Sequence, residues 1–264
     1  MTSQTMDSAI RVSEYEQLET FAKAFATGEL NLMIVVGRPG IAKSETIRGC
    51  VEAPCWIEGT ATAFGMYGEL HRHKDSLVVI DDVDALYSDK ASVRLLKSLC
   101  QTRETKTLRW LTNAAEQSGL PTEFETSSSV CIIANEWTTP NENVKALIDR
   151  GHFLHFDPTT QQVHEKVKAW FDDEEILNWF GQNLSLFPAL SMRSYVKAKE
   201  LKAVGMDWKS FSLSHLGDKE RAIIELTQNN QYATEADRVE VFQRETGASR
   251  ATYFNLKKKL VVSS

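Results

Sequence analysis

A loop between residues 36 and 45 combines residue types that can hold phosphate groups. Lys43 supplies a positive charge, the Ser44 hydroxyl can ligate Mg²⁺, and glycines let backbone N–H groups approach phosphate oxygens. The spacing matches a nucleotide phosphate loop, except that Ala42 replaces its last glycine; a positive φ there costs only about 1 kcal/mol. The loop predicts a site for ATP with Mg²⁺, and the alternative is a Gly/Pro turn before a helix. The candidate residues are Gly37, Arg38, Pro39, Gly40, Ile41, Ala42, Lys43, Ser44 and Glu45.

Two carboxylates follow the apolar segment Leu77–Ile80. An apolar strand that ends in such a pair can hold the magnesium shell and polarise an attacking water. Asp81 is the expected Mg²⁺ residue together with Ser44, partly through water, and Asp82 is the expected catalytic carboxylate. Asp82 is one methylene shorter than Glu, and Asp84 is a spare carboxylate. These residues can also cap a helix that begins near Asp84, and the two roles are compatible.

Short apolar segments alternate with helical patterns around these residues. This alternation is typical of a mostly parallel sheet that helices cover on both faces. The sequence therefore predicts a three-layer α/β core over residues 1–158. The expected strands are Leu32–Val36, Cys55–Ile57, Leu77–Ile80, Val130–Ala134 and Phe153–Phe156, and the expected helices are Ser13–Ala26, Glu45–Val51, Phe64–His71 and Ser88–Cys100.

No strand pattern follows residue 158. We therefore expect a helical lid over residues 159–210 and a C-terminal helical domain over residues 217–264. The expected lid helices are Val163–Trp170, Glu174–Asn183 and Met192–Val204.

Composition limits the classes of partner and compartment. The 264 residues carry a net charge of -6, so any nucleic-acid contact must be local. The four cysteines form no CxxC pair and lie in or beside apolar segments, which predicts reduced thiols and no disulfide. No apolar run approaches the length of a membrane span. We expect a soluble, cytoplasmic protein that does not act at a membrane.

The order of the motifs resembles that of the AAA+ ATPase superfamily, over roughly Phe21 to Lys202. GRPGIAKS looks like the phosphate loop of the MoxR-type branch, where Ala before Lys is familiar, and LVVIDDVD corresponds to the second nucleotide motif. VCIIAN ends at Asn135, which corresponds to the first sensor that orients the lytic water. ALIDRGHFLHFDP places Arg150 as the arginine finger is placed, and SMRSYVKA places Arg193 as the second sensor.

The resemblance implies an ATPase whose catalytic residues are Asp82, Asn135, Arg150 and Arg193. Arg150 would reach the nucleotide of the neighbouring subunit, so hydrolysis would require a homo-oligomer, expected to be a hexameric ring or spiral. Each side chain alone also has an ordinary interpretation. Asn135 can cap a loop, Arg150 can form a surface ion pair, and Arg193 can lie on a solvated helix face.

The C-terminal stretch TGASRATYFNLKKKL resembles the second helix of a helix-turn-helix. Gly247 fits the turn and Ser249 fits the helix N-cap, with supporting helices expected over Asp218–Asn229 and Ala236–Thr246. The alternative is a protein-docking bundle whose last lysines are a solubilising tail. The candidate DNA-binding residues are Arg250, Thr252, Asn255, Lys257, Lys258 and Lys259.

Two other segments are candidates for contact with a substrate. Phe64 and Tyr67 belong either to an exposed aromatic loop or to a helix core. The long segment between Gln101 and Ser129 is either a hairpin that grips a nucleic-acid strand or a surface hairpin that packs Trp110 and Leu111. The cationic and aromatic residues of this segment are Arg103, Lys106, Arg109 and Trp110.

Three functions are compatible with these features. The first, which we favour, is a DNA-associated AAA+ ATPase for replication loading or transposition, with a protein partner in such a complex. The second is a MoxR-like chaperone that remodels a protein client. The third is an ATP-gated scaffold or regulator that hydrolyses weakly, which the short side chain of Asp82 leaves open.

Overall fold

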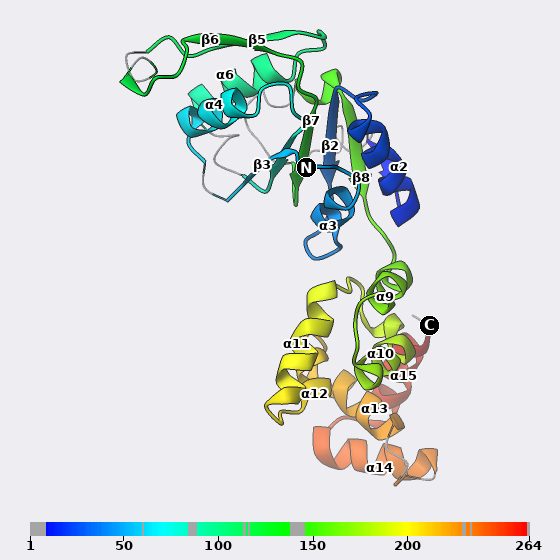
Figure 1. Ribbon diagram of the computed structural model, residues 1–264. Coiled ribbons are helices and arrows are strands. Elements are labelled where there is room, and N and C mark those ends of the chain that lie inside the picture. The colour runs from blue at the N-terminus through cyan, green and yellow to red at the C-terminus, as the bar shows by residue number, and fades with distance from the viewer. Residues whose placement is uncertain are drawn as a thin grey trace. The chain divides into compact units, whose positions relative to one another are not determined.

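The computed structural model describes residues 9–59, 61–83, 89–112, 115, 117–137, 146–228, 231–232 and 234–262. The chain divides into two compact units, Met1–Pro158 and Thr159–Ser264 (Figure 1). All strands of the described residues belong to the first unit, and the second unit is helical.

A six-stranded sheet forms the centre of the first unit. Its strand order is β1-β8-β2-β7-β4-β3, and every neighbouring pair is parallel. The candidate phosphate loop follows β2, which lies between β7 and β8, so the loop leaves the sheet with a strand on each side. The strands are β1 Ile10–Val12, β2 Leu32–Val36, β3 Cys55–Glu58, β4 Val78–Asp81, β7 Val130–Ala134 and β8 His152–Phe156.

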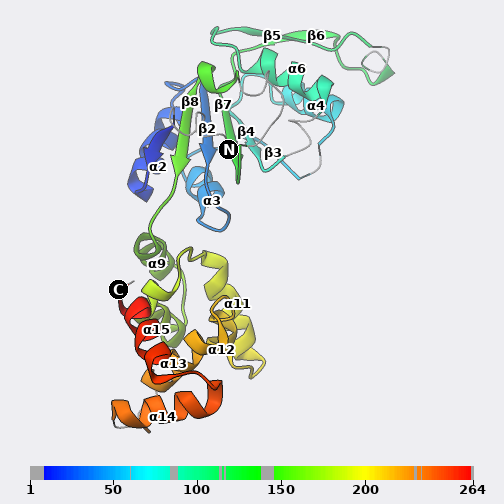
Figure 2. The same ribbon diagram turned by 180° about the vertical axis from the view of Figure 1, so that it is seen from behind.

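Helices cover both faces of this sheet (Figures 1 and 2). β2 is buried throughout because Leu32, Ile34 and Val36 join the cluster formed with α4 and α6, while Met33 and Val35 are fully buried as well. Burial on both faces is what an all-apolar parallel strand requires. The three-layer α/β fold is therefore confirmed. The helices are α2 Tyr15–Ala26, α3 Lys43–Arg48, α4 Ala63–Arg72 and α6 Lys90–Leu99.

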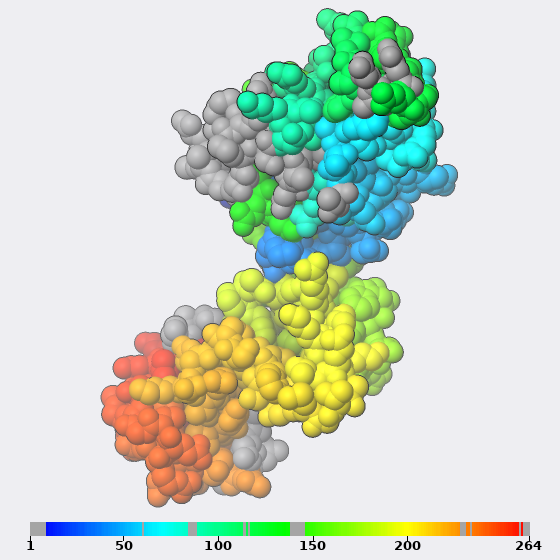
Figure 3. Space-filling model, turned by 90° about the vertical axis from the view of Figure 1, so that its left-hand side faces the viewer, coloured from blue at the N-terminus to red at the C-terminus, as the bar shows by residue number. Residues whose placement is uncertain are grey.

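A two-stranded antiparallel hairpin, β5 Lys106–Arg109 and β6 Glu123–Thr126, lies between α6 and β7 in the chain. Figure 3 shows the hairpin, in green, on the surface of the first unit beside the cyan helices. On its inner face Leu108 opposes Phe124, and both belong to the apolar cluster. The hairpin interpretation of this segment was correct, although the sequence did not place its strands.

Lys106 lies on this inner face because alternate residues of a strand point to opposite sides. It is fully buried, and its ammonium donates a hydrogen bond to the carbonyl of Ser128. Burial lowers the pKa of Lys106. The hypothesis that Lys106 grips nucleic acid is wrong, because its charge is directed into the protein.

The second unit has two apolar clusters within its described residues. Trp179, Phe180 and Tyr195 of α10 and α11 pack ring against ring. Phe242 and Tyr253 belong to a separate cluster in the last three helices. The helices are α9 Thr160–Lys168, α10 Glu174–Gln182, α11 Met192–Ala203, α12 Trp208–Ser212, α13 Asp218–Gln228, α14 Glu235–Thr246 and α15 Arg250–Val262.

The sequence did not predict β1 and α12. β1 is only three residues long and α12 only five, so neither leaves a periodic pattern. The cysteines Cys50, Cys55, Cys100 and Cys131 are free thiols. None of the described helices has the length and apolar character that a membrane span requires.

Candidate phosphate-binding site

Three strands of the sheet end side by side at its carboxyl edge. Val36 of β2 pairs in register with Ala134 of β7, and Asp81 of β4 pairs with Ile133. The phosphate loop, the acidic pair and Asn135 follow these strands directly. Parallel strands thus bring together residues that are about 40 to 90 positions apart in the sequence.

Lys43 is the centre of this arrangement and is only 6% exposed. Its ammonium donates to the carbonyls of Gly37 at 2.6 Å and Arg38 at 3.0 Å, and to Asn135 Oδ1 at 3.1 Å. Asn135 Nδ2 donates in turn to both carboxylate oxygens of Asp82, at 3.0 and 3.1 Å. A continuous chain of hydrogen bonds therefore joins a lysine, an amide and a carboxylate that the sequence had singled out separately.

Asp81 and Ser44 form a second contact across the same edge, a hydrogen bond between their side chains. Partial burial raises the pKa of Asp81, the Ser44 hydrogen bond opposes the rise, and the charges of Asp82 and Glu58 add to it. A cation between Asp81 and Ser44 would offset the cost of ionising this carboxylate.

Glu58 is a candidate that the sequence analysis missed. It ends β3 and pairs in register with Asp81. Its carboxylate lies 3.4 Å from Arg48, whose guanidinium lies 3.8 Å above the ring of Trp56. The available signal was the carboxylate after the short apolar segment CWI, which repeats the pattern of the strand before Asp81.

The phosphate loop is fixed by contacts with the rest of the first unit. The Tyr15 hydroxyl of α2 donates to the carbonyl of Ile41 at 3.1 Å, and Ile41 is fully buried. A Cβ on Gly37 would lie 2.2 Å from the carbonyl oxygen of Phe156, so only glycine fits at this point. The loop is therefore attached to α2 and to β8, which limits its freedom before any ligand binds.

The other loop residues lie nearer to solvent. Arg38 donates to the carbonyl of Pro158 at 2.9 Å, and its Nε is 3.6 Å from a carboxylate oxygen of Asp157. Its guanidinium thus holds the end of β8. Pro39 and Glu45 are exposed.

The backbone takes a left-handed conformation at three positions of this edge. Gly40 has a φ of 75°, Ala42 of 59° and Asp82 of 54°. Residues with a Cβ pay about 1 kcal/mol or more for this conformation, and such residues cluster at functional sites. Ala42 therefore adopts the backbone that the usual glycine takes.

The residues present fit ATP and Mg²⁺. No group of three or more His, Cys, Asp or Glu side chains able to hold a metal occurs in the described part of the chain. Mg²⁺ does not need such a cage, because it is commonly held by one or two protein oxygens with water and substrate phosphates. Ser44 and Asp81 offer that donor set, and Lys43 offers charge for phosphate oxygens.

Arg150 lies at the opposite edge of the same sheet. It ends a short 3₁₀ helix, Ile148–Arg150, just before β8, and its Nη1 donates to the carbonyl of Lys97 at 2.9 Å. β2 and β8 are parallel, and Met33 pairs with His152. A five-residue strand is roughly 16 Å long. Arg150 therefore does not meet Lys43 of its own chain.

Arg193 belongs to the second unit. It is exposed in the first turn of α11, whose N-cap Ser191 accepts a hydrogen bond from the Arg193 amide at 3.2 Å. Asp84 lies outside the described residues, and so does the side chain of Lys259.

The last two helices, α14 and α15, are joined by a short turn. Gly247 ends α14 with a φ of 66°, and three residues separate α14 from α15. Such a turn of three to four residues, often with glycine, is typical of the helix-turn-helix motif. The Ser249 hydroxyl accepts from the Thr252 amide at 3.2 Å, which caps α15.

The candidate DNA-binding residues on α15 fall into two groups. Arg250, Asn255 and Lys258 are exposed. Thr252 is half-buried beside Ser249, and Lys257 forms an ion pair of 2.6 Å with Glu235 of α14. The sequence missed Phe254, which is 41% exposed and lies 5.5 Å from the Arg250 guanidinium.

Phe64 and Tyr67 belong to the core and form no exposed aromatic loop. Tyr67 is fully buried and donates to the carbonyl of Pro121 at 2.8 Å. Both rings pack against Trp110, at centroid distances of 5.7 and 5.8 Å. Leu111, by contrast, is 74% exposed.

Sequence comparison finds a distant relative from a bacteriophage. No protein-family model matches the chain. The chain is 26% identical over 203 residues to an uncharacterised 36.7 kDa protein from the nrdC–mobD intergenic region of Enterobacteria phage T4. The match covers 63% of this chain and 62% of the phage protein, so the chain spans less than two thirds of that relative.

Solved structures resemble the chain only distantly. NtrX from Brucella abortus in complex with ATP has a TM-score of 0.46 and 12% identity, over 95% of this chain and 68% of that one. Drosophila ORC bound to DNA has a TM-score of 0.39 and 14% identity, over 97% and 82%. The Bacillus subtilis DNA clamp loader delta protein has a TM-score of 0.36 and 12% identity, over 90% and 75%. At these values the likenesses establish neither ligand nor activity for this chain.

Proposed function

We propose that this protein is an oligomeric ATPase of the AAA+ type that acts on DNA. The observation that supports it best is the hydrogen-bonded chain from Lys43 through Asn135 to Asp82 at the carboxyl edge of the sheet. Bound ATP would supply the reactive phosphoanhydride, and Mg²⁺ would neutralise its charge at Ser44 and Asp81. In this proposal Lys43 binds phosphate, Asn135 orients the attacking water and Asp82 polarises it.

Arg150 and Arg193 complete the proposed catalytic set. Arg150 is remote from Lys43 of its own chain, so it acts on the nucleotide of a neighbouring copy. A guanidinium there neutralises the charge that grows during phosphoryl transfer. Arg193, exposed at the start of α11, contacts nucleotide from the lid. Assembly of several copies in a ring or spiral is thus part of the mechanism.

DNA contact is proposed for the exposed face of α15. Arg250 and Lys258 are two helical turns apart, with Asn255 between them. Their exposure, together with the turn at Gly247, favours a helix that presents cations to the phosphates and an amide to base edges. Replication loading or transposition is the proposed setting, with a protein partner in that complex.

The decisive experiment measures ATP hydrolysis against protein concentration, with and without single- and double-stranded DNA. We expect a rate per subunit that rises with concentration and is stimulated by DNA. Lys43→Ala should abolish binding of a fluorescent ATP analogue. Arg11→Ala, an exposed residue on β1, is the matched control. Tight ATP binding by Lys43→Ala would contradict the proposal.

A weakly hydrolysing ATP-gated regulator is the second candidate, and the contacts of Asp82 favour it. Both oxygens of this short carboxylate are taken by Asn135. For turnover, one of them must also accept a hydrogen bond from the attacking water. ATP binding without measurable turnover at any protein concentration would select this alternative over the ATPase.

A further inference from the structure

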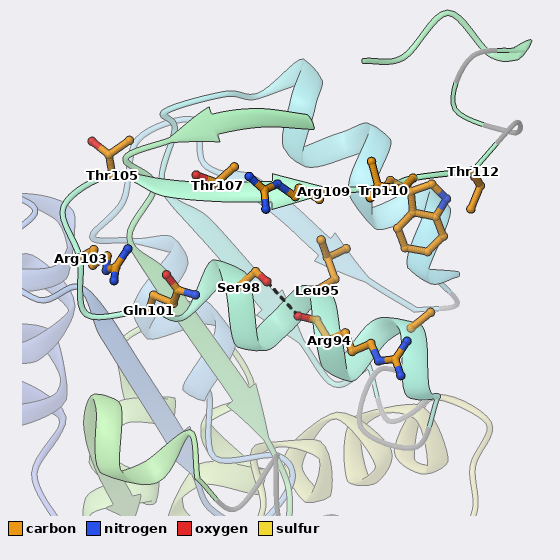
Figure 4. A pocket seen from close by; sticks show the side chains of 12 residues that line it. Arg94, Leu95, Ser98, Gln101, Arg103, Thr105, Thr107, Arg109, Trp110 and Thr112 are labelled. Atoms are coloured by element: carbon orange, nitrogen blue, oxygen red, sulfur yellow. Dashed lines mark hydrogen bonds between the residues drawn. The ribbon is translucent and has the colours of Figure 1, made fainter. Parts of the chain in front are cut away.

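A concave groove on the first unit carries arginines that the proposed site does not use. It has a volume of about 560 Å³ and lies between α6 and the β5 segment (Figure 4). α6 contributes Arg94 and Ser98 to one wall, and the segment that leads into and out of β5 contributes Arg103, Thr107 and Arg109 to the other. None of the described residues that line it is acidic. This basic groove is therefore a local exception on a chain whose net charge is -6.

The residue spacings of a helix and of a strand place these side chains along the groove. Arg94 and Ser98 are four residues apart, so they lie on the same face of α6. Thr107 and Arg109 alternate with the buried Lys106 and Leu108, so their side chains share the outer face of β5. Arg103 and Thr105 line the groove from the bends that precede this strand. The row from Arg103 to Arg109 is at most about 20 Å long.

The arginines differ in their present partners. Arg109 Nε donates to a carboxylate oxygen of Glu123 at 2.8 Å, which offsets part of its charge. Within the described residues, no ion pair involves Arg94 or Arg103, and both are exposed. Among the described residues of the groove, these two guanidinium groups are therefore the ones with no carboxylate partner. Planar guanidinium forks match phosphate oxygens better than lysine ammonium groups do.

From this geometry we infer that the basic groove binds the phosphodiester backbone of single-stranded nucleic acid. A slot between a helix and a strand accepts one extended chain, whereas duplex DNA is entered by a protruding helix or ribbon. The ring of Trp110 packs against Phe64 and Tyr67. Backbone contacts therefore dominate, and binding shows little sequence preference.

The inference deepens the proposed function, because it gives the ATPase core its own contact with a DNA strand separate from α15. It rests on the proposed function in one respect, which is that nucleic acid is the natural partner. Groove binding needs no ATP. The two proposals can therefore fail independently.

The test uses the full chain and a fluorescently labelled single-stranded oligonucleotide, followed by anisotropy at several salt concentrations. Arg94→Ala/Arg103→Ala should weaken binding at least tenfold. The slope of log K against log salt should become shallower by roughly 1.4, the value for two lost single-strand phosphate contacts. The matched control is Arg11→Ala/Lys23→Ala, which removes the same charge from exposed positions on β1 and α2 and should leave affinity within twofold.

Three results would overturn the inference. They are unchanged affinity of the groove variant, an equal loss in the control, and displacement of the oligonucleotide by polyglutamate at lower charge concentration than by unlabelled DNA. Binding of a fluorescent ATP analogue is measured in the same samples. Loss of oligonucleotide binding with normal ATP binding supports the groove. Failure to bind ATP, with oligonucleotide binding intact, defeats only the ATPase proposal.

Discussion

The carboxyl and amino edges of the six-stranded sheet, where its parallel strands end and begin, differ in whether their candidate functional residues already contact one another. At the carboxyl edge Lys43, Asn135 and Asp82 already contact one another, and Tyr15 holds the loop in place. At the amino edge Arg150 donates to the backbone carbonyl of Lys97 in its own chain. One edge is thus assembled by folding alone. In the proposed function, the other contributes to phosphate chemistry only when another copy is placed against it.

This difference predicts separable effects on binding and turnover. We expect Arg150→Ala to lower ATP turnover by on the order of 10³-fold, the lower range for loss of an arginine finger. Affinity for a fluorescent ATP analogue should change less than twofold, because the carboxyl edge is intact. Steady-state hydrolysis and equilibrium binding measure the two effects.

A mixing experiment sharpens the same comparison. In a mixture of Arg150→Ala with Lys43→Ala chains, some interfaces pair an intact loop with an intact arginine, so activity should return above that of either variant alone. Melting temperatures control for loss of the Lys97 contact. Equal loss of binding and turnover in Arg150→Ala would count against a role across the interface.

Substitutions of the two carboxylates Asp82 and Glu58 at the carboxyl edge should lower ATP turnover by different amounts. We expect Asp82→Asn to lower turnover by about 10²-fold, a typical contribution of a positioned base. Glu58→Gln should lower it less than fivefold, because its carboxylate is 63% exposed and paired with Arg48. Single-turnover hydrolysis of pre-bound ATP compares them. The reverse order would make Glu58 the residue that polarises water.

Asp81 offers a test through stability. Its folded-state pKa is raised mainly by burial, so the native state binds its proton more tightly than the unfolded state does. Stability is therefore lost as pH rises from the ordinary Asp pKa through the raised value, and the cost persists above it. Without Mg²⁺, Asp81→Asn should raise the melting temperature at pH 8, and the gain should disappear as pH falls below about 4.

Asp75 is the control of opposite sign. Hydrogen bonds from Ser127 lower its pKa, so its ionised form stabilises the fold above the ordinary pKa, and this contribution is lost as pH falls through the lowered value. Asp75→Asn should lower the melting temperature at pH 8 by more than at pH 4. A lower melting temperature for Asp81→Asn at pH 8 would show that its contact with Ser44 outweighs burial.

The carboxyl edge was largely predictable because parallel strands convert sequence order into proximity. Lys43, Asp82 and Asn135 each follow an apolar segment, and once those segments are parallel strands the three residues must meet. Glu58 obeys the same rule, but its strand is short and half-buried, so its signal was weak. The roles of these residues stay predictions, as does the division of residues 159–264 into a lid and a DNA-binding part.

The direction of a side chain was less predictable where it depends on strand register or on how two helices pack. Lys106 is buried because the register of β5 with β6 places it beside Leu108. Lys257 turns to Glu235, 22 residues away, an ion pair that depends on how α14 and α15 pack. The sequence named Arg103 and Arg109 as cations of a possible nucleic-acid hairpin but did not find Arg94, because Arg94 and Arg103 belong to different elements and converge only through the packing of α6 against β5.

The smallest expected effect concerns the residue that departs from the usual phosphate loop. Ala42→Gly removes a Cβ from a residue with a φ of 59°, and Ala53→Gly does the same at an exposed residue with a φ of 42° outside the candidate site. Relief of left-handed strain, of about 1 kcal/mol, is partly offset by the greater entropy of glycine in the unfolded chain. Each change should therefore raise the free energy of unfolding by less than 1 kcal/mol. Urea denaturation measures both.

Only Ala42→Gly should also alter affinity for the ATP analogue, and by no more than about threefold, because the native loop already has the conformation that glycine favours. A large gain in affinity would mean instead that the alanine restrains the loop, and that its replacement of glycine weakens nucleotide binding in this chain.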